Sequence, residues 1–369
     1  MTRRVLFVGR SRFRLPLEPG LARKWEALGE AMDVRVLARA EEANGAGDPR
    51  FVLAPPLRPR RLDGAAYYAA LPARVARELR RFRPDAVVAQ GPYEAAAALV
   101  ARRLARVRAP LVVELHGDWR TATRLYGSPV RRLLRPLADR VADTAVRRAD
   151  AVRAISGYTT GLLGPLGVEP AATFPAYVDL SAFVGRPPEP LPERPRALFV
   201  GVLERYKGVD VLAEAWRDVA ARVPEARLLL VGSGPLAPVA QALAGERAEW
   251  VRRLAPEEVA RALDESSLLV LPSRSEGLPR IVIEAFARGR PVVGTRAGGI
   301  PDIVEDGVAG LLVPPEDARA LADALTTALS DRELLERLAA GARSAADAWL
   351  QTPEEFAART RELVERALA

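Results

Sequence analysis

Short apolar runs alternate with longer amphipathic stretches along the whole of this 369-residue chain. In the first half we expect strands at residues 5–8, 34–37, 86–89, 111–115 and 151–155, with helices at 22–31, 65–82, 94–105 and 130–148. Strands that alternate with helices form parallel sheets with helices on both faces. The pattern therefore restricts this half to a doubly wound α/β domain.

A proline-rich stretch at residues 186–195 interrupts the alternation, which then resumes. Because proline ends regular elements, we interpret the stretch as an interdomain linker. Further strands are expected at 197–200, 227–231, 268–271, 291–294 and 311–313, with helices at 209–222, 256–264, 280–288 and 318–329. We therefore predict two doubly wound domains, 1–185 and 196–349, followed by a helical segment at 350–369.

Composition excludes several classes of protein. No run of eighteen apolar residues could span a bilayer, and the apolar run near the N-terminus ends by Arg10, so it suits a strand better than a signal peptide. The absence of cysteine excludes disulfides, thiolate catalysis and cysteine-bound metals. Together these features favour a cytoplasmic protein.

Charge is distributed unevenly between the two halves. Residues 1–186 hold 32 Lys and Arg against 18 Asp and Glu, a net charge of +14, whereas residues 187–369 hold 23 against 29, a net charge of −6. A basic half could bind nucleic acid, an anionic membrane surface or a phosphorylated substrate, or could simply carry an arginine-rich surface. Lys24 and Lys207 are the only lysines, which hints that their sites need a compact ammonium.

Polar and glycine-rich segments follow several of the expected strands. They contain His116, Gly201, Lys207, Gly232, Gly234 and the run 273–277. Ligands of open parallel sheets bind outside the carboxyl ends of the strands. Because both halves carry such segments, the simplest arrangement has the two domains facing each other across a central cleft.

Glu284 lies within an expected helix that is apolar nearly all round. A buried carboxylate needs hydrogen-bond donors, and a ribose diol supplies two hydroxyl groups. A structural ion pair with Arg288 or Arg290 is an equally good interpretation of the sequence. Pro279, just before this helix, suits a helix start.

The segment around Glu284 resembles a known signature. Glu276 and Glu284, with seven residues between them, are similar to the E-x7-E motif of family 4 of the retaining glycosyltransferases. The neighbouring runs 199–210, 230–235 and 298–313 resemble the other loops of that family's second domain. The resemblance implies the GT-B fold, in which two Rossmann-like domains face a central cleft and the C-terminal helix crosses back to the first domain.

The resemblance also implies roles for individual residues. Glu284 would hold the ribose hydroxyls, Glu276 would contact the transferred sugar, and Lys207 would neutralise the leaving diphosphate. His116 matches a histidine beside the donor sugar. The remaining donor-binding residues would be Arg205, Gly201, Gly232, Gly234, Gly277, Leu278 and Pro279. The expected substrate is a UDP- or GDP-linked sugar, with no other cofactor.

This sequence departs from the family pattern at some positions. Many relatives have an arginine where this chain has Val202, and Arg205 is a candidate substitute. The sequence also lacks an Asp-x-Asp pair of the kind that bridges a diphosphate through a metal. We therefore expect no metal ligands and a metal-independent transfer, with Lys207, Arg205 and a helix N-terminus in place of the cation.

The acceptor is predicted only in outline. Arg12 and Arg14, in an expected loop after the first strand, suit phosphate or carboxylate groups, so we expect an anionic or lipid-linked acceptor or contact with the inner face of a membrane. Two other functions stay open, a nucleotide-sugar epimerase of the same architecture and a nucleic-acid-binding protein that uses the basic half. Few aromatic residues accompany the arginines, which disfavours nucleic acid.

Overall fold

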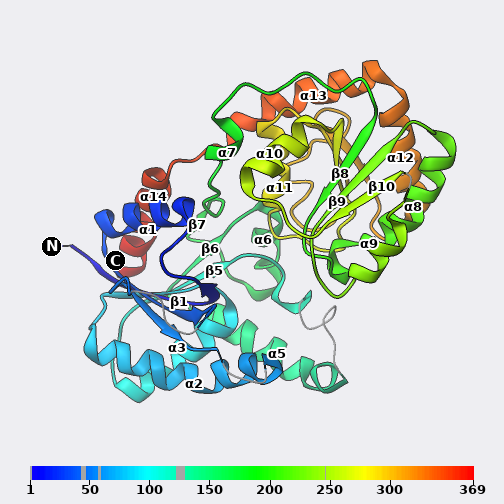
Figure 1. Cartoon of the computed structure of the whole chain (residues 1–369). Coiled ribbons are helices and arrows are strands. Elements are labelled where there is room, and N and C mark those ends of the chain that lie inside the picture. Colours follow the sequence, from blue (N-terminus) through cyan, green and yellow to red (C-terminus); the bar gives the residue numbers. More distant parts are fainter. Residues whose placement is uncertain (1, 43–46, 57–59, 122–128, 246) are drawn as a thin grey trace. The chain divides into compact units, whose positions relative to one another are not determined.

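The protein folds into two compact units. A computed structural model describes residues 2–42, 47–56, 60–121, 129–245 and 247–369, without the side chains of 60–62 and 129–132. One unit comprises Met1–Tyr177 together with Gln351–Ala369, and the other comprises Val178–Leu350 (Figure 1). Among the helices described, none combines the length and the apolar character that a membrane span requires.

The first unit is built on a parallel sheet of seven strands in the order β3-β2-β1-β4-β5-β6-β7. The strands are β1 (Arg4–Phe13), β2 (Asp33–Ala40), β3 (Phe51–Ala54), β4 (Ala86–Ala89), β5 (Leu111–Leu115), β6 (Ala151–Ala154) and β7 (Ala172–Thr173). The strand order reverses between β1 and β4. That reversal marks the switch point near which ligands of doubly wound sheets bind.

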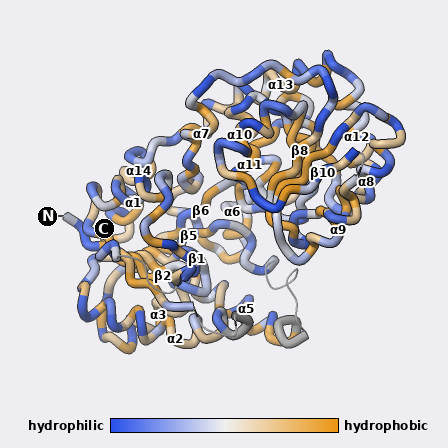
Figure 2. Tube along the Cα trace, viewed as in Figure 1, coloured by the Kyte–Doolittle hydropathy of each residue, from blue (hydrophilic) through white to orange (hydrophobic). Residues whose placement is uncertain are grey.

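Helices cover both faces of this sheet. They are α1 (Pro19–Ala31), α2 (Arg60–Arg81), α3 (Pro92–Ala105), α5 (Pro129–Arg147), α6 (Gly157–Gly161) and α14 (Pro353–Leu368). Successive residues of β1 enter different cores, since Leu6 and Val8 pack with α2 and α3 while Val5 and Phe7 pack with α1 and α14. Burial on both faces explains why the strands are continuous apolar runs (Figure 2).

The second unit repeats this plan with six parallel strands in the order β10-β9-β8-β11-β12-β13. The strands are β8 (Arg196–Val200), β9 (Arg227–Val231), β10 (Ala248–Val251), β11 (Leu268–Leu271), β12 (Val292–Thr295) and β13 (Gly310–Val313). The helices are α7 (Ser181–Val184), α8 (Val209–Arg222), α9 (Ala237–Leu243), α10 (Pro256–Asp264), α11 (Arg280–Ala287), α12 (Ala318–Ser330) and α13 (Arg332–Ala346). The prediction of two doubly wound domains is confirmed.

The C-terminal helix α14 completes the first unit, as the predicted fold class requires. Phe356 is buried 6.0 Å, centroid to centroid, from the ring of Phe174. The Arg3 guanidinium donates to both carboxylate oxygens of Glu365 at 2.8 and 2.9 Å. Helix α14 therefore covers the sheet face that α1 covers only in part.

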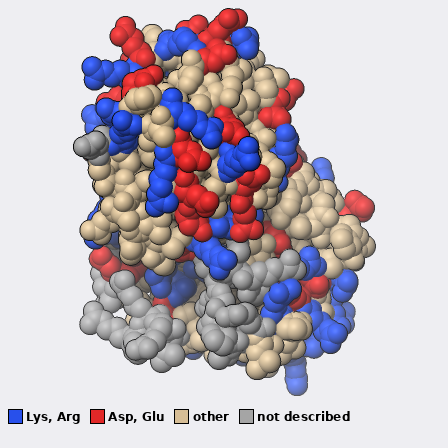
Figure 3. All heavy atoms as spheres, turned by 90° about the vertical axis from the view of Figure 1, so that its right-hand side faces the viewer, with Lys and Arg blue, Asp and Glu red and all other residues tan. Residues whose placement is uncertain are grey.

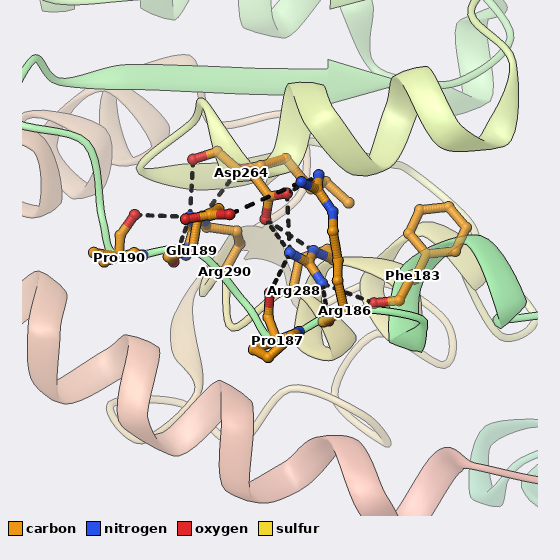
Figure 4. Close-up of polar contacts among 9 residues, drawn as sticks. Phe183, Arg186, Pro187, Glu189, Pro190, Asp264, Arg288 and Arg290 are labelled. Carbon is orange, nitrogen blue, oxygen red and sulfur yellow. Dashed lines mark hydrogen bonds and ion pairs between the residues drawn. The ribbon is translucent and has the colours of Figure 1, made fainter.

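The proline-rich stretch at 186–195 differs from the linker that the sequence predicts, because it belongs to the second unit. The chain passes between the units at Tyr177. Figure 4 shows the buried guanidinium groups of Arg288 and Arg290 directed at backbone carbonyls of the preceding segment. The accepting carbonyls are those of Phe183, Arg186, Pro187, Glu189 and Pro190. Prolines lack an N–H but keep this acceptor, so the stretch is fixed without secondary structure.

Strand β1 is longer than its apolar run predicts. The expected loop at 10–14 is in large part strand, because Arg12 and Phe13 pair with Arg39 and Ala40 of β2 after a shift in register. Phe13 is buried, 5.1 Å from the ring of Phe51. This apolar anchor beyond three polar residues extends the strand, so the predicted loop was wrong.

Candidate active site

The loops that follow β8 and β9 are joined through their backbones. The Gly201 amide donates to Val231 O at 2.9 Å, and the Leu203 amide donates to Ser233 O at 3.0 Å. A Cβ at Gly232 would lie 1.8 Å from Gly201 O, and one at Gly234 would lie 2.6 Å from Leu203 O. These three glycines are brought together, and close backbone contact by itself explains the two after β9.

Lys207 and Glu276, predicted from distant parts of the sequence, form an ion pair at the carboxyl ends of β8 and β11. Lys207 Nζ lies 2.6 Å from Glu276 Oε1, and the side chains are only 11% and 9% exposed. Ser273 Oγ donates to the same carboxylate oxygen at 2.7 Å. The ammonium is thus held at a fixed place near the surface of the second unit.

Glycines fix the backbones on both sides of this pair. Gly208 follows Lys207 in the left-handed conformation (φ +67°), where a Cβ would lie 2.0 Å from Pro272 O. At Gly298 (φ +56°), an added Cβ would lie 2.0 Å from Glu276 O. The same oxygen accepts a hydrogen bond from the Gly299 amide at 3.0 Å. Larger residues at 208 or 298 would displace the turn that carries Lys207 or the segment that carries Glu276.

Arg274 is a residue of this site that the sequence analysis did not single out. Its guanidinium donates to both carboxylate oxygens of Asp210 at 2.8 Å, to Glu316 at 2.8 Å and to the carbonyl of Arg205. Burial alone would raise the pKa of Asp210, but the hydrogen bond and the charge of Arg274, together with backbone hydrogen bonds, lower that pKa. Arg274 therefore ties the 3-10 turn η2 (Arg205–Lys207) to α8 and to the loop after β11.

Glu284 is buried in α11, as predicted, but its partner is Arg280 one turn earlier. Arg280 Nη2 lies 3.0 Å from Glu284 Oε1, and the Arg280 side chain is 67% exposed. The proposed partners Arg288 and Arg290 instead bind Asp264 and the segment 183–190 (Figure 4). Burial raises the pKa of Glu284, and Arg280 only partly opposes this shift.

The remaining residues that were predicted to bind the donor lie in the segment before α11 and in η2. Pro279 occupies the N-cap of α11, one position before the first helical residue, and Leu278 packs against the core of the second unit. Gly277 links Leu278 to Glu276. Arg205, in η2, and Val202, three residues earlier in the sequence, are both exposed. The proposal that Arg205 substitutes for the missing arginine stays a prediction.

His116 lies in the first unit, immediately after β5. Its side chain is 41% exposed, with Nε2 3.5 Å from Oε2 of the buried Glu114. Glu114 also pairs with the buried Arg153. Burial would raise the pKa of Glu114, but the charges of Arg153, His116 and Lys24 together lower it. The carboxylate therefore stays ionised behind an accessible imidazole.

Arg12 and Arg14 have different surroundings. Arg12 Nη2 lies 2.7 Å from the buried carboxylate of Asp63, which also binds Arg39. The Arg14 side chain is exposed. Arg12 is thus partly committed to holding β1 against α2. Within the described part of the chain, no group of three or more His, Asp or Glu side chains could hold a metal ion.

Two family models match the chain, one over each unit. Residues 19–176 match a model described as a glycosyl transferase 4-like domain, and residues 194–331 match glycosyl transferases group 1. A sulfoquinovosyl transferase of Arabidopsis thaliana is 36% identical over 41% of this chain and 30% of its own length. A D-inositol 3-phosphate glycosyltransferase of Nocardioides is 36% identical over 47% of this chain and 42% of its own. The chain thus spans less than half of each relative.

Solved structures share the fold over nearly the whole chain. Sucrose-phosphate synthase from Thermosynechococcus elongatus superposes with a TM-score of 0.79 and 20% identity, covering 99% of this chain and 98% of its own. HepE of Anabaena, solved with UDP and glucose, superposes with a TM-score of 0.70 and 22% identity, covering 97% and 99%. The fold is GT-B, as the resemblance implies.

Proposed function

This chain belongs to the glycosyl transferases of the GT-B fold, and we propose that it moves a sugar from a nucleoside diphosphate to an acceptor hydroxyl with retention of configuration. The observation that carries the proposal is the buried pair of Lys207 and Glu276 at the strand ends of the second unit. A fixed ammonium at that edge suits a diphosphate leaving group. The epimerase alternative shares the fold but uses no acceptor.

Lys207 would act on the diphosphate. An ammonium has three donors, so its bond to Glu276 leaves capacity for phosphate oxygens. Because the side chain is already fixed, little reorganisation is needed when charge develops on the departing phosphate. The N-terminus of α11 would add backbone N–H groups and a positive dipole end.

Glu276 and Glu284 would hold the donor at its two ends. The Glu284 carboxylate would accept hydrogen bonds from the ribose diol once the exposed Arg280 side chain moves aside, and Glu276 would contact the transferred sugar. Gly232 and Gly234 let the loops after β8 and β9 approach each other closely, and together with Gly201 they would line the donor site. The donor would be a UDP- or GDP-linked sugar; HepE, which shares this fold, was solved with UDP.

The proposed transfer needs no metal ion, because Lys207 and the N-terminus of α11 supply positive charge to the diphosphate. Activity should therefore persist after treatment with a chelator. A strict requirement for a divalent cation would remove this part of the proposal.

The first unit would bind the acceptor and supply His116 to the reaction centre. A similar protein is named for D-inositol 3-phosphate, a phosphate-bearing compound, and the exposed Arg14 suits such a group. We therefore propose an anionic or lipid-linked acceptor, with Arg12 in a secondary role because Asp63 holds it. The basic first unit would also contact the inner face of a membrane.

An assay of nucleoside diphosphate release tests the proposed function. The full chain is incubated with UDP- and GDP-sugars, with and without a mixture of anionic and lipid-linked acceptors. We expect release that depends on an acceptor and an anomeric configuration that NMR shows to be retained. Conversion of the donor sugar without any acceptor would favour the epimerase, and inversion would contradict the retaining mechanism.

A further inference from the structure

Large apolar side chains are exposed on two neighbouring helices of the first unit. Six of the ten most exposed ones among the described residues lie on α3 and α5, namely Val100, Leu104, Leu133, Leu134, Leu137 and Val141. Leu133 is 81% exposed and Leu137 is 61% exposed. Single exposed leucines are ordinary, but a group on one surface indicates a binding face.

Helix α5 presents its larger apolar side chains outward. Leu133, Leu137 and Val141 are spaced four residues apart and so form one stripe along the helix. The face toward the core carries smaller residues such as the buried Ala142 and Ala145. A helix that served only to cover the sheet would have the opposite distribution.

A basic hollow lies beside this stripe. Five arginines line a cavity of about 550 Å³ where α3 ends, namely Arg102, Arg103, Arg106, Arg108 and Arg148. Arg148 follows the last residue of α5, and α3 packs against α5, so the hollow and the stripe adjoin. Arg102 is paired with Asp150 at 3.0 Å, whereas the exposed Arg103, Arg106 and Arg108 direct positive charge to solvent.

The acidic residues of α5 do not offset this charge. Asp139 lies 3.7 Å from Arg135, and Asp143 lies 2.9 Å from Arg120. Figure 3, which views the molecule from the right-hand side of Figure 1, shows basic side chains gathered at the lower right of that face. The surface is therefore both apolar and cationic.

We propose that this α3–α5 surface, the six apolar residues together with the five arginines of the hollow, docks on an anionic lipid bilayer. The leucines would enter the boundary between headgroups and acyl chains, and the arginines would bind lipid phosphates. Charge complementarity favours a bilayer over a second copy of this chain, because the same arginines of the second copy would repel those of the first. The proposal identifies the residues of the membrane contact that is part of the proposed function. Docking itself does not depend on sugar transfer.

Co-sedimentation of the full chain with vesicles tests this docking. One set of vesicles contains phosphatidylcholine alone, and the other also contains phosphatidylglycerol. The variants are Arg103→Gln with Arg106→Gln, and Leu133→Ser with Leu137→Ser. Control variants change exposed residues of the second unit: Arg253→Gln with Arg319→Gln matches the arginine pair, and Val308→Ser removes an exposed apolar side chain.

We expect the wild type to bind only the phosphatidylglycerol vesicles, less tightly as salt rises. The variant with two arginines replaced should bind about 30-fold more weakly and the variant with two leucines replaced at least about tenfold more weakly, while the controls stay within about twofold of the wild type.

Binding that neither pair weakens, or no binding by the wild type, would overturn the proposal. Concentration-dependent dimerisation lost in the leucine variant would assign the stripe to contact between copies instead. Because none of these readouts involves a nucleotide sugar, their failure would leave the proposed transfer untouched.

Discussion

At the scale of single residues, Lys207 carries the largest share of the proposed chemistry. It is nine-tenths buried and fixed by Glu276, so its charge should act mainly when negative charge develops on the leaving diphosphate. We expect Lys207→Ala to lower kcat by about 10²–10³-fold with a smaller change in donor KM. Steady-state kinetics beside Arg253→Ala, an exposed control, measures this. Unchanged turnover would remove Lys207 from the site.

Glu284, the residue that we propose to bind the ribose, is expected to lower the stability of the fold. Because burial raises its pKa above the value in the unfolded chain, the ionised carboxylate is disfavoured by folding at neutral pH. We expect Glu284→Gln to melt higher than the wild type at pH 7. The advantage should shrink as the pH falls through the raised pKa, where the wild-type carboxyl is protonated. Thermal unfolding at several pH values checks the trend; a variant less stable at pH 7 would show that Arg280 outweighs burial.

At the scale of elements, the site depends on loops that approach each other closely. Gly298 and Gly307 are both left-handed, but a Cβ at Gly298 would meet Glu276 O at 2.0 Å, whereas nothing lies within 4 Å of one at Gly307. Gly307→Ala should therefore cost only the conformational penalty of about 1–2 kcal/mol. Gly298→Ala should cost more and should also weaken donor binding. Denaturant unfolding and nucleotide titration of both variants distinguish them, and equal losses would contradict the account.

The elements also show what sequence patterns can and cannot predict. Apolar runs such as 111–115 and 268–271 were located to the residue, because strands covered on both faces are apolar throughout. Strands β3, β7 and β10 were missed, since they are short and partly exposed. Arg274 was missed because its partners Asp210 and Glu316 lie far away in sequence. The segment 186–195 has no periodicity, and only the buried arginines that bind it reveal its place.

At the scale of the whole molecule, the two units have net charges of opposite sign and, in our proposal, different tasks. The acidic second unit would bind the anionic sugar donor through a few fixed hydrogen-bond donors gathered at one place. The basic first unit would face an anionic acceptor or bilayer. Helix α14 brings the C-terminal end of the chain back to the first unit, which also contains the N-terminal end. The proposed donor and docking functions would therefore lie on separate units and could be changed independently.

Nucleotide binding tests the central claim, that the second unit holds a nucleoside diphosphate sugar through Glu284, more directly than any other measurement. Calorimetric titration of UDP and GDP into the full chain and into Glu284→Gln requires no knowledge of the acceptor. We predict that one of the two nucleotides binds the wild type and that the variant, still folded, binds it at least about tenfold more weakly. A folded variant with wild-type affinity, or a wild type that binds neither nucleotide, would contradict the assignment.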